Sequence, residues 1–164
     1  MAHDRDDNDR GHDRDGCIRV SADLIGYQEL PALSTTAHGP FGAVIDRKAD
    51  TITWKWSDDA LEGSVAQSHV HFGQMSANGG ISFLLCSNLG NGPQACPPGP
   101  AKLTGVITPD LVIGPGPVGT PAASGQDIEA EAFAEIATAI KEGVAYANVH
   151  SSKWPGGEVR GQLH

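Results

Sequence analysis

Apolar residues alternate with polar ones along most of this chain, and that period of two constrains the fold more than any other feature of the sequence. Side chains two residues apart lie on the same face of a strand, so each alternating stretch predicts a strand with one buried face. Eight such stretches, separated by turn residues, cover residues 18–24, 41–45, 51–56, 65–72, 80–86, 103–108, 144–150 and 158–163.

The segment 127–141 departs from this pattern because its apolar residues recur every four positions, at Ile128, Ala132, Ile136 and Ile140. That spacing predicts a single amphipathic helix, which we expect Asp127 to cap and Gly143 to end. A loop rich in glycine and proline, residues 113–125, leads into it. We therefore predict an all-β fold, an antiparallel β-sandwich or Greek-key-like barrel of about eight strands with one amphipathic helix.

The first 16 residues form a charged tail with six Asp and three Arg and almost no apolar side chain. Such a segment cannot bury enough surface to offset the entropy lost on ordering, so we expect it to be disordered. Residues 17–164 are long enough for one domain with an ordinary core, and we expect a single β domain there.

The formal net charge of -9 argues against nucleic acid or an anionic membrane surface as a partner, because both repel an acidic protein. No apolar run approaches the ~20 residues that a membrane-spanning helix needs. We expect an extracytoplasmic protein, secreted or periplasmic, whose signal peptide has already been removed. Its expected partner is a small anion or an extracellular protein, and the sequence does not indicate an oligomeric state.

Three cysteines are present, and two of them bracket a short loop rich in Gly, Asn and Pro. Because such a loop brings its ends together easily, we favour a disulfide between Cys86 and Cys96. The alternative is a pair of unpaired buried thiols, since a disulfide depends on an oxidising compartment. Cys17 is left as a free thiol or as an anchoring or intermolecular site.

Two histidines, His69 and His71, lie two positions apart within a predicted strand, so both imidazoles point to one face and can converge on a metal ion. The alternative is a pair of solvent-facing polar residues. His150 lies in another predicted strand and adds a third candidate ligand. His38, in a predicted loop, is a possible fourth ligand or an exposed side chain.

Other polar side chains gather by the same strand parity near the C-terminus. Asn148 shares a face with His150, and the stretch 158–162 carries Glu158, Arg160 and Gln162 on one face. These faces either meet water, as one side of an antiparallel sheet often does, or form a hydrogen-bonded network around the histidines. In the second case we expect Asn148, Glu158 and Gln162 to fix the imidazole tautomers.

Two motifs in this order resemble those of the chordin-type (CHRD) domain family. Residues 145–163 read Ala-Tyr-Ala-Asn-Val-His, a Pro-Gly turn and Gly-Glu-Val-Arg-Gly-Gln-Leu, which is similar to the ending of CHRD domains. Residues 67–74, Gln-Ser-His-Val-His-Phe-Gly-Gln, resemble the Ala-His-Ile-His-x-Gly element of the same family. The resemblance implies an extracytoplasmic β-sandwich-like domain with a histidine site, and it implies fold more firmly than activity.

A weaker resemblance, to copper/zinc superoxide dismutase, rests on the His-Val-His strand and a disulfide-tied loop. The sequence lacks that family's zinc-loop run of histidines and Asp, so we expect one metal ion rather than a bridged pair. Copper is favoured and iron or zinc is possible, because three imidazoles suit all of these. On this hypothesis the protein is a superoxide dismutase-like oxidoreductase in which Arg160 attracts a small anion such as superoxide. The alternative is a non-catalytic extracellular binding module with structural histidines. No hydrolase motif is present.

Overall fold

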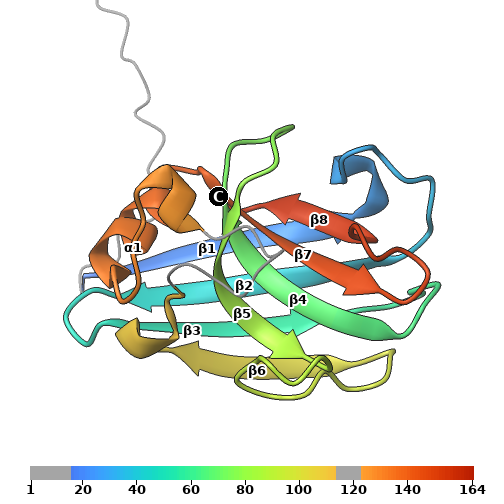
Figure 1. Cartoon of the computed structure of the whole chain (residues 1–164), viewed down its shortest axis with the longest axis horizontal. Coiled ribbons are helices and arrows are strands. Elements are labelled where there is room, and N and C mark those ends of the chain that lie inside the picture. Colours follow the sequence, from blue (N-terminus) through green and yellow to red (C-terminus); the bar gives the residue numbers. More distant parts are fainter. Residues whose placement is uncertain (1–15, 114–122) are drawn as a thin grey trace, which may run out of the picture.

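The computed structural model describes residues 16–113 and 123–164, and eight strands of this part of the chain form one antiparallel sheet (Figure 1). The strands are β1 (Cys17–Ile25), β2 (His38–Asp46), β3 (Thr51–Ser57), β4 (Val65–Phe72), β5 (Gly80–Ser87), β6 (Lys102–Ile107), β7 (Ala145–Ser151) and β8 (Val159–Gln162). The predicted all-β fold of about eight strands is confirmed.

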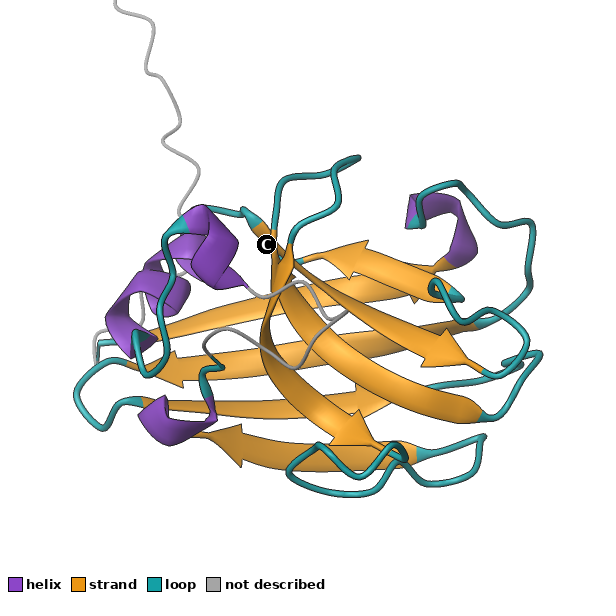
Figure 2. Cartoon of the chain, viewed as in Figure 1, coloured by secondary structure: helices purple, strands orange, loops and turns teal. Residues whose placement is uncertain are grey.

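The sheet curls into a nearly closed barrel, with strand order β5-β4-β7-β8-β1-β2-β3-β6 (Figure 2). The consecutive pairs β1–β2, β2–β3, β4–β5 and β7–β8 are antiparallel neighbours. In contrast, β3 pairs with β6, β4 pairs with the distant β7, and β8 meets β1 where Ile25 lies opposite Arg160. The edge strands β5 and β6 do not pair directly. Gln94, in the loop between them, donates hydrogen bonds to the carbonyl oxygens of Leu85 and Thr104, 3.4 and 3.1 Å away, and so links the two edges.

One face of each strand fills the barrel, as the period of two predicts. In β3, Ile52, Trp54 and Trp56 are almost fully buried, and the residues between them are partly or largely exposed. From the other side of the barrel, Val70 and Phe83 join the same core. Most of this interior comes from aliphatic and aromatic side chains, whose removal from water supplies the main favourable free energy of folding.

The helix is shorter than predicted, since α1 runs only from Phe133 to Lys141. Asp127 does not cap it, and that prediction is wrong. Asp127 and Glu131 both have positive φ angles, +70° and +64°, which an α-helix cannot contain. Ile128 is nevertheless buried in the core, so the segment before α1 supplies a core residue without helical geometry. Gly143, with φ of +73°, follows the end of the helix as expected.

The predicted disulfide is confirmed, because the structure joins Cys86 and Cys96. Cys17, at the start of β1, is a free, half-buried thiol. Most of the predicted tail, residues 1–15, and most of the expected loop before α1, residues 114–122, lie outside the described residues. Within the described ranges, no helix is long and apolar enough to span a membrane.

Gly105 in β6 provides a test of barrel packing. A Cβ atom there would lie only 2.6–2.9 Å from three atoms of the buried Trp54 indole, so Gly105→Ala should destabilise the fold by about 1–3 kcal/mol. Gly42→Ala in β2 is the control, because its Cβ would first meet the flexible Lys55 side chain at 3.5 Å. Urea unfolding of both variants measures the difference, and equal stabilities would contradict this account of the core.

Candidate metal centre

The pairing of β4 with β7 brings the three predicted histidine ligands together. In this register His69 lies opposite Asn148, and His71 opposite Tyr146, while His150 is opposite Gln67. Residues of the same parity on adjacent strands share a face, so all three imidazoles project from one side of the sheet. One ring nitrogen from each histidine lies within 4.8 Å of those of the other two.

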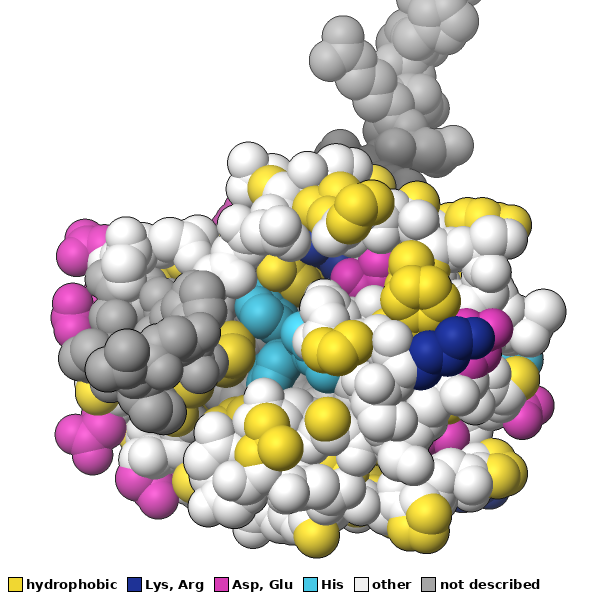
Figure 3. Space-filling view, turned by 45° about the vertical axis from the view of Figure 1, so that its right-hand side comes forward, with side chains coloured by type: hydrophobic (Ala, Val, Ile, Leu, Met, Phe, Trp, Pro, Cys, Tyr) yellow, Lys and Arg dark blue, Asp and Glu magenta, His cyan; other side chains and the backbone are white. Residues whose placement is uncertain are grey.

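This histidine face is the outer face of the sheet, since Val70, Ala147 and Val149, from alternate positions of the same strands, belong to the core. It is nevertheless largely shielded from water. His69 and His71 are only 2% and 8% exposed, and His150 is half-buried. Figure 3 shows histidine side chains in a hollow of the surface, surrounded by other parts of the chain. The cluster is therefore a recessed site that remains visible from outside.

Each histidine has an outward hydrogen bond, through one ring nitrogen, to an oxygen that can only accept. His69 Nε2 donates to Gln67 Oε1 at 2.9 Å, and His71 Nδ1 donates to the carbonyl oxygen of Gly79 at 2.9 Å. His150 Nδ1 donates to the carbonyl oxygen of Pro155 at 2.7 Å. Because a neutral imidazole carries one N–H, these bonds leave the second nitrogen of each ring without a hydrogen and able to accept or to bind a cation.

The three lone pairs point inward. His69 Nδ1 and His71 Nε2 lie 3.1 Å apart, and His150 Nε2 completes the group. Two nitrogens that both lack a hydrogen repel each other at this distance, whereas a cation between them would attract both. Three neutral imidazoles with outer acceptors are a donor set typical of zinc, copper and iron sites. The residues therefore fit a metal ion.

Burial keeps these imidazoles neutral. Desolvation is the main cause that lowers the pKa of His69 to about 2, with smaller effects of His71 and His150. Desolvation, with a smaller effect of His150, likewise lowers the pKa of His71 to about 4. The pKa of His150 is also lowered by burial, against a smaller opposing effect of its bond to Pro155. A metal ligand must be deprotonated, so the cluster is ready to bind a cation at neutral pH.

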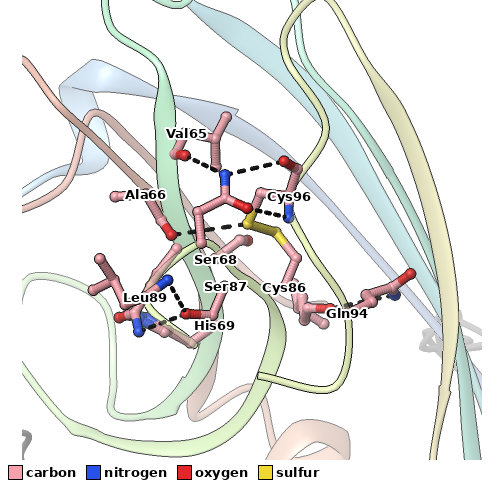
Figure 4. Close-up of a disulfide and its surroundings, with 12 residues drawn as sticks. Val65, Ala66, Ser68, His69, Cys86, Ser87, Leu89, Gln94 and Cys96 are labelled. Atoms are coloured by element: carbon pink, nitrogen blue, oxygen red, sulfur yellow. Dashed lines mark hydrogen bonds between the residues drawn. A yellow bond between two sulfur atoms is a disulfide. The ribbon is translucent and has the colours of Figure 1, made fainter. Parts of the chain in front are cut away.

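Gln67, which orients His69, is itself oriented by the disulfide loop. Its Nε2 donates to Ser87 Oγ at 3.1 Å and to Asn91 Oδ1 at 2.8 Å, and this leaves Oε1 for His69. Ser87 directly follows Cys86, whose disulfide to Cys96 closes the loop (Figure 4). Sequence reasoning did not identify Gln67, although it occupies the position two residues before His69 and hence the same strand face.

Of the predicted tautomer-fixing residues, the structure brings Asn148 into contact with the histidines. Gln162 instead donates to the carbonyl oxygens of Gly73 and Gly143. The carboxylate of Glu158 is fully buried and accepts hydrogen bonds from Ser151 Oγ and from the Glu62 backbone N–H. For Glu158 and Gln162 a role at the histidines stays a prediction, and the bonds found hold loops in place.

Arg160 is 2% exposed and donates through Nη2 to the carbonyl oxygens of Gln74 and Ala77. Its guanidinium carbon lies 3.4 Å from the centroid of the Tyr146 ring, and that ring in turn stacks on His71 at 4.7 Å. This stack fixes the plane of His71 from the side. These contacts give the guanidinium a structural role. The expected attraction of an anion by Arg160 stays a prediction.

His38 does not join the cluster. It begins β2 rather than lying in a loop, its side chain is exposed, and its Nδ1 bonds to the carbonyl oxygen of Thr36. Within the described residues, only His69, His71 and His150 form a histidine, cysteine or carboxylate group close enough to share an ion. A fourth ligand from His38 is therefore not supported by this geometry.

Glu29 is a residue that sequence reasoning missed. It is 5% exposed, and its Oε1 has no hydrogen-bond partner. Burial raises its pKa to about 7, against the opposing effects of Arg160 and of a hydrogen bond from the Asn148 amide. Gly157 makes room for it, because a Cβ there would lie 2.5–2.7 Å from the carboxylate. As a single acidic residue before Leu30-Pro31, Glu29 has no motif to reveal it.

Comparison with known proteins finds one family that matches most of the chain. The model of the CHRD domain family matches residues 20–163, which include all three histidines. No significant match is found among curated proteins or among solved structures. The family and the disulfide both favour an extracellular module.

The lowered pKa of His71 predicts how the stability of the metal-free protein depends on pH. Below pH 6.5 the unfolded chain protonates this histidine but the folded chain does not, so its contribution to stability decreases from pH 6.5 towards pH 4. At pH 5 the loss is about 2 kcal/mol. Urea unfolding measures the free energy of unfolding at pH 7 and at pH 5. The decrease between these two pH values should be larger for the native chain than for His71→Gln. The opposite contribution of Glu29 is common to both, and equal differences would contradict the burial of a neutral imidazole.

Proposed function

We propose that this chain, which belongs to the CHRD domain family, binds one metal ion through His69, His71 and His150 as an extracellular metalloprotein. The observation that carries this proposal is the set of three outward hydrogen bonds, which leave three ring lone pairs facing one another. If the histidines had only a structural role, we would expect their inner nitrogens to form hydrogen bonds with one another. Here such a bond between His69 and His71 is not possible, because neither His69 Nδ1 nor His71 Nε2 has a hydrogen to donate.

Copper is the favoured ion. Imidazole nitrogens bind copper, zinc and iron(II), and among divalent ions of the first row the affinity of such a site is greatest for copper(II). Two paired strands hold the ligands, so the site is rigid. The disulfide indicates an oxidising compartment, and such a compartment keeps copper in its divalent state. Zinc and iron(II) remain the alternatives that the donor set accepts.

Superoxide dismutase-like redox activity is the finer part of the proposal. Copper would supply an electron acceptor and donor that alternates between two oxidation states. The residues of this chain would hold the imidazoles neutral, restrict water and fix the ligand planes through the Tyr146 and Arg160 stack. The hollow over the histidines supports access for a small anion (Figure 3). We place this activity in a secreted or periplasmic protein.

A non-catalytic binding module with an extracellular protein partner is the second candidate. Three loops contribute to the histidine face, through Gln67 and its disulfide loop, Gly79 and Pro155. An ion held there would tie the loops to the sheet without any turnover. The observation that favours this candidate is the deep burial of His69 and His71.

Metal content tests the proposal directly. The metal-free native chain, a His69/His71/His150→Gln triple variant and a His38→Gln control are incubated with copper(II) or zinc(II), freed of unbound metal and analysed by mass spectrometry. We expect about one equivalent in the native chain and in His38→Gln, and none in the triple variant, because three imidazoles are required for a tight site.

Equal metal content in the native chain and the triple variant would overturn the metal site. Superoxide turnover by the copper-loaded native chain, absent from the triple variant, is the result expected for the redox function. A copper-loaded native chain with no turnover would leave the non-catalytic module.

A further inference from the structure

Asn148 lies in the middle of the histidine cluster. Its Oδ1 is 3.0 Å from His71 Nε2 and 3.3 Å from His69 Nδ1, and its Nδ2 is 3.0 Å from His150 Nε2. The side chain is 4% exposed, on the same face of β7 as His150 and directly opposite His69. The amide therefore touches the inner nitrogen of all three rings.

The orientation of this amide follows from the group that its Nδ2 faces. Nδ2 lies 3.0 Å from His150 Nε2, which accepts one of its hydrogens because the Nδ1 of that ring donates to the carbonyl oxygen of Pro155. The buried carboxylate of Glu29 also interacts with the Asn148 side chain, and this interaction lowers the pKa of Glu29 against the larger effect of burial. A carboxylate accepts two or more hydrogen bonds, and Glu29 still has an unpartnered buried oxygen. With Nδ2 turned to His150, the amide oxygen is the end that faces His69 and His71.

This orientation brings together three atoms that all accept hydrogen bonds and have no hydrogen to share. Asn148 Oδ1, His69 Nδ1 and His71 Nε2 form a triangle with sides of 3.0, 3.1 and 3.3 Å. Buried acceptors left facing one another are costly. Ligands at ~2.0–2.2 Å from one ion, with bond angles between octahedral and tetrahedral values, lie about 2.9–3.4 Å apart. The triangle has the dimensions of one face of a coordination sphere.

We propose that Asn148 Oδ1 is an additional, oxygen ligand of the metal ion, and that Glu29 is the positioning residue that keeps this oxygen turned towards it. This inference rests on the proposed metal site and deepens it, giving a donor set of three imidazole nitrogens and one amide oxygen. His150 Nε2 exchanges its bond with Asn148 Nδ2 for the ion, while Glu29 retains the amide. The oxygen ligand makes the site harder, so it prefers divalent copper or zinc to copper(I).

The test measures zinc(II) affinity, by competition with a chromophoric chelator, for Asn148→Leu and Glu29→Gln. Asn148→Leu keeps the size of the side chain and all three histidines, so we expect one equivalent of zinc, bound roughly 10–100-fold more weakly. Glu29→Gln replaces a carboxylate, which only accepts, by an amide that can also donate, so the Asn148 amide is free to turn and we expect a loss of about tenfold. Asn78→Leu and Glu142→Gln, at exposed positions, are the matched controls and should retain the native affinity.

A double-mutant cycle separates positioning from simple damage to the fold. In the Asn148→Asp variant both side-chain ends are oxygens, so the orientation no longer matters. Glu29→Gln should therefore weaken zinc binding in the native background and have no such effect in the Asn148→Asp background. An equal loss in both backgrounds would overturn the positioning role of Glu29. This comparison remains decisive if Asn148→Leu does not fold.

The copper(II) EPR spectrum reports the ligand directly. Loss of the oxygen ligand in Asn148→Leu should shift the copper hyperfine coupling while the splitting from three nitrogens remains. One outcome is that the native chain binds zinc and copper, that the triple histidine variant does not, and that Asn148→Leu matches the native chain in affinity and spectrum. In that case the proposed oxygen ligand is wrong, but the histidine site stands. If the triple variant binds as the native chain does, the proposed function itself fails.

Discussion

The antiparallel pairing of β4 with β7 is the contact on which the histidine cluster depends. These strands are separated by more than 70 residues of sequence, and their register places His69 beside Asn148 and within reach of His150. A slip of one residue would turn every side chain of β4 to the other face, which would bring Val70 out and the histidines into the core. The hydrophobic core therefore specifies the position of the site, since burying Val70, Ala147 and Val149 on one face places the polar residues on the other.

That polar face is under electrostatic strain in the metal-free chain. Its outer hydrogen bonds are complete, through Gln67, Gly79 and Pro155, but the inner nitrogens of His69 and His71 are acceptors that meet without a hydrogen. Folding around such a group is unfavourable by itself, and the large core, the disulfide and the backbone bonds of eight strands offset it. A bound cation would convert this repulsion into attraction, so metal binding and folding would stabilise each other.

The strands could be predicted from sequence because a period of two is a local signal, and all eight were found within a few residues of their limits. The start of α1 could not, because burial of Ile128 and the turn at Glu131 outweigh a helical spacing. His69 and His71 followed from strand parity. Gly79 and Pro155 act through backbone oxygens, which any residue has, and Glu29 reaches the site from a distant loop, so no pattern in the sequence could indicate them.

The central claim is that the outer hydrogen bonds fix the tautomer of each histidine and leave three lone pairs facing inward. Two-bond ¹H–¹⁵N correlation spectra of the imidazoles in the metal-free protein measure this, since they distinguish protonated from bare ring nitrogens. We expect the hydrogen on Nε2 in His69 and on Nδ1 in both His71 and His150 at pH 7. Opposite tautomers, or rapid exchange between the two forms at these rings, would contradict it.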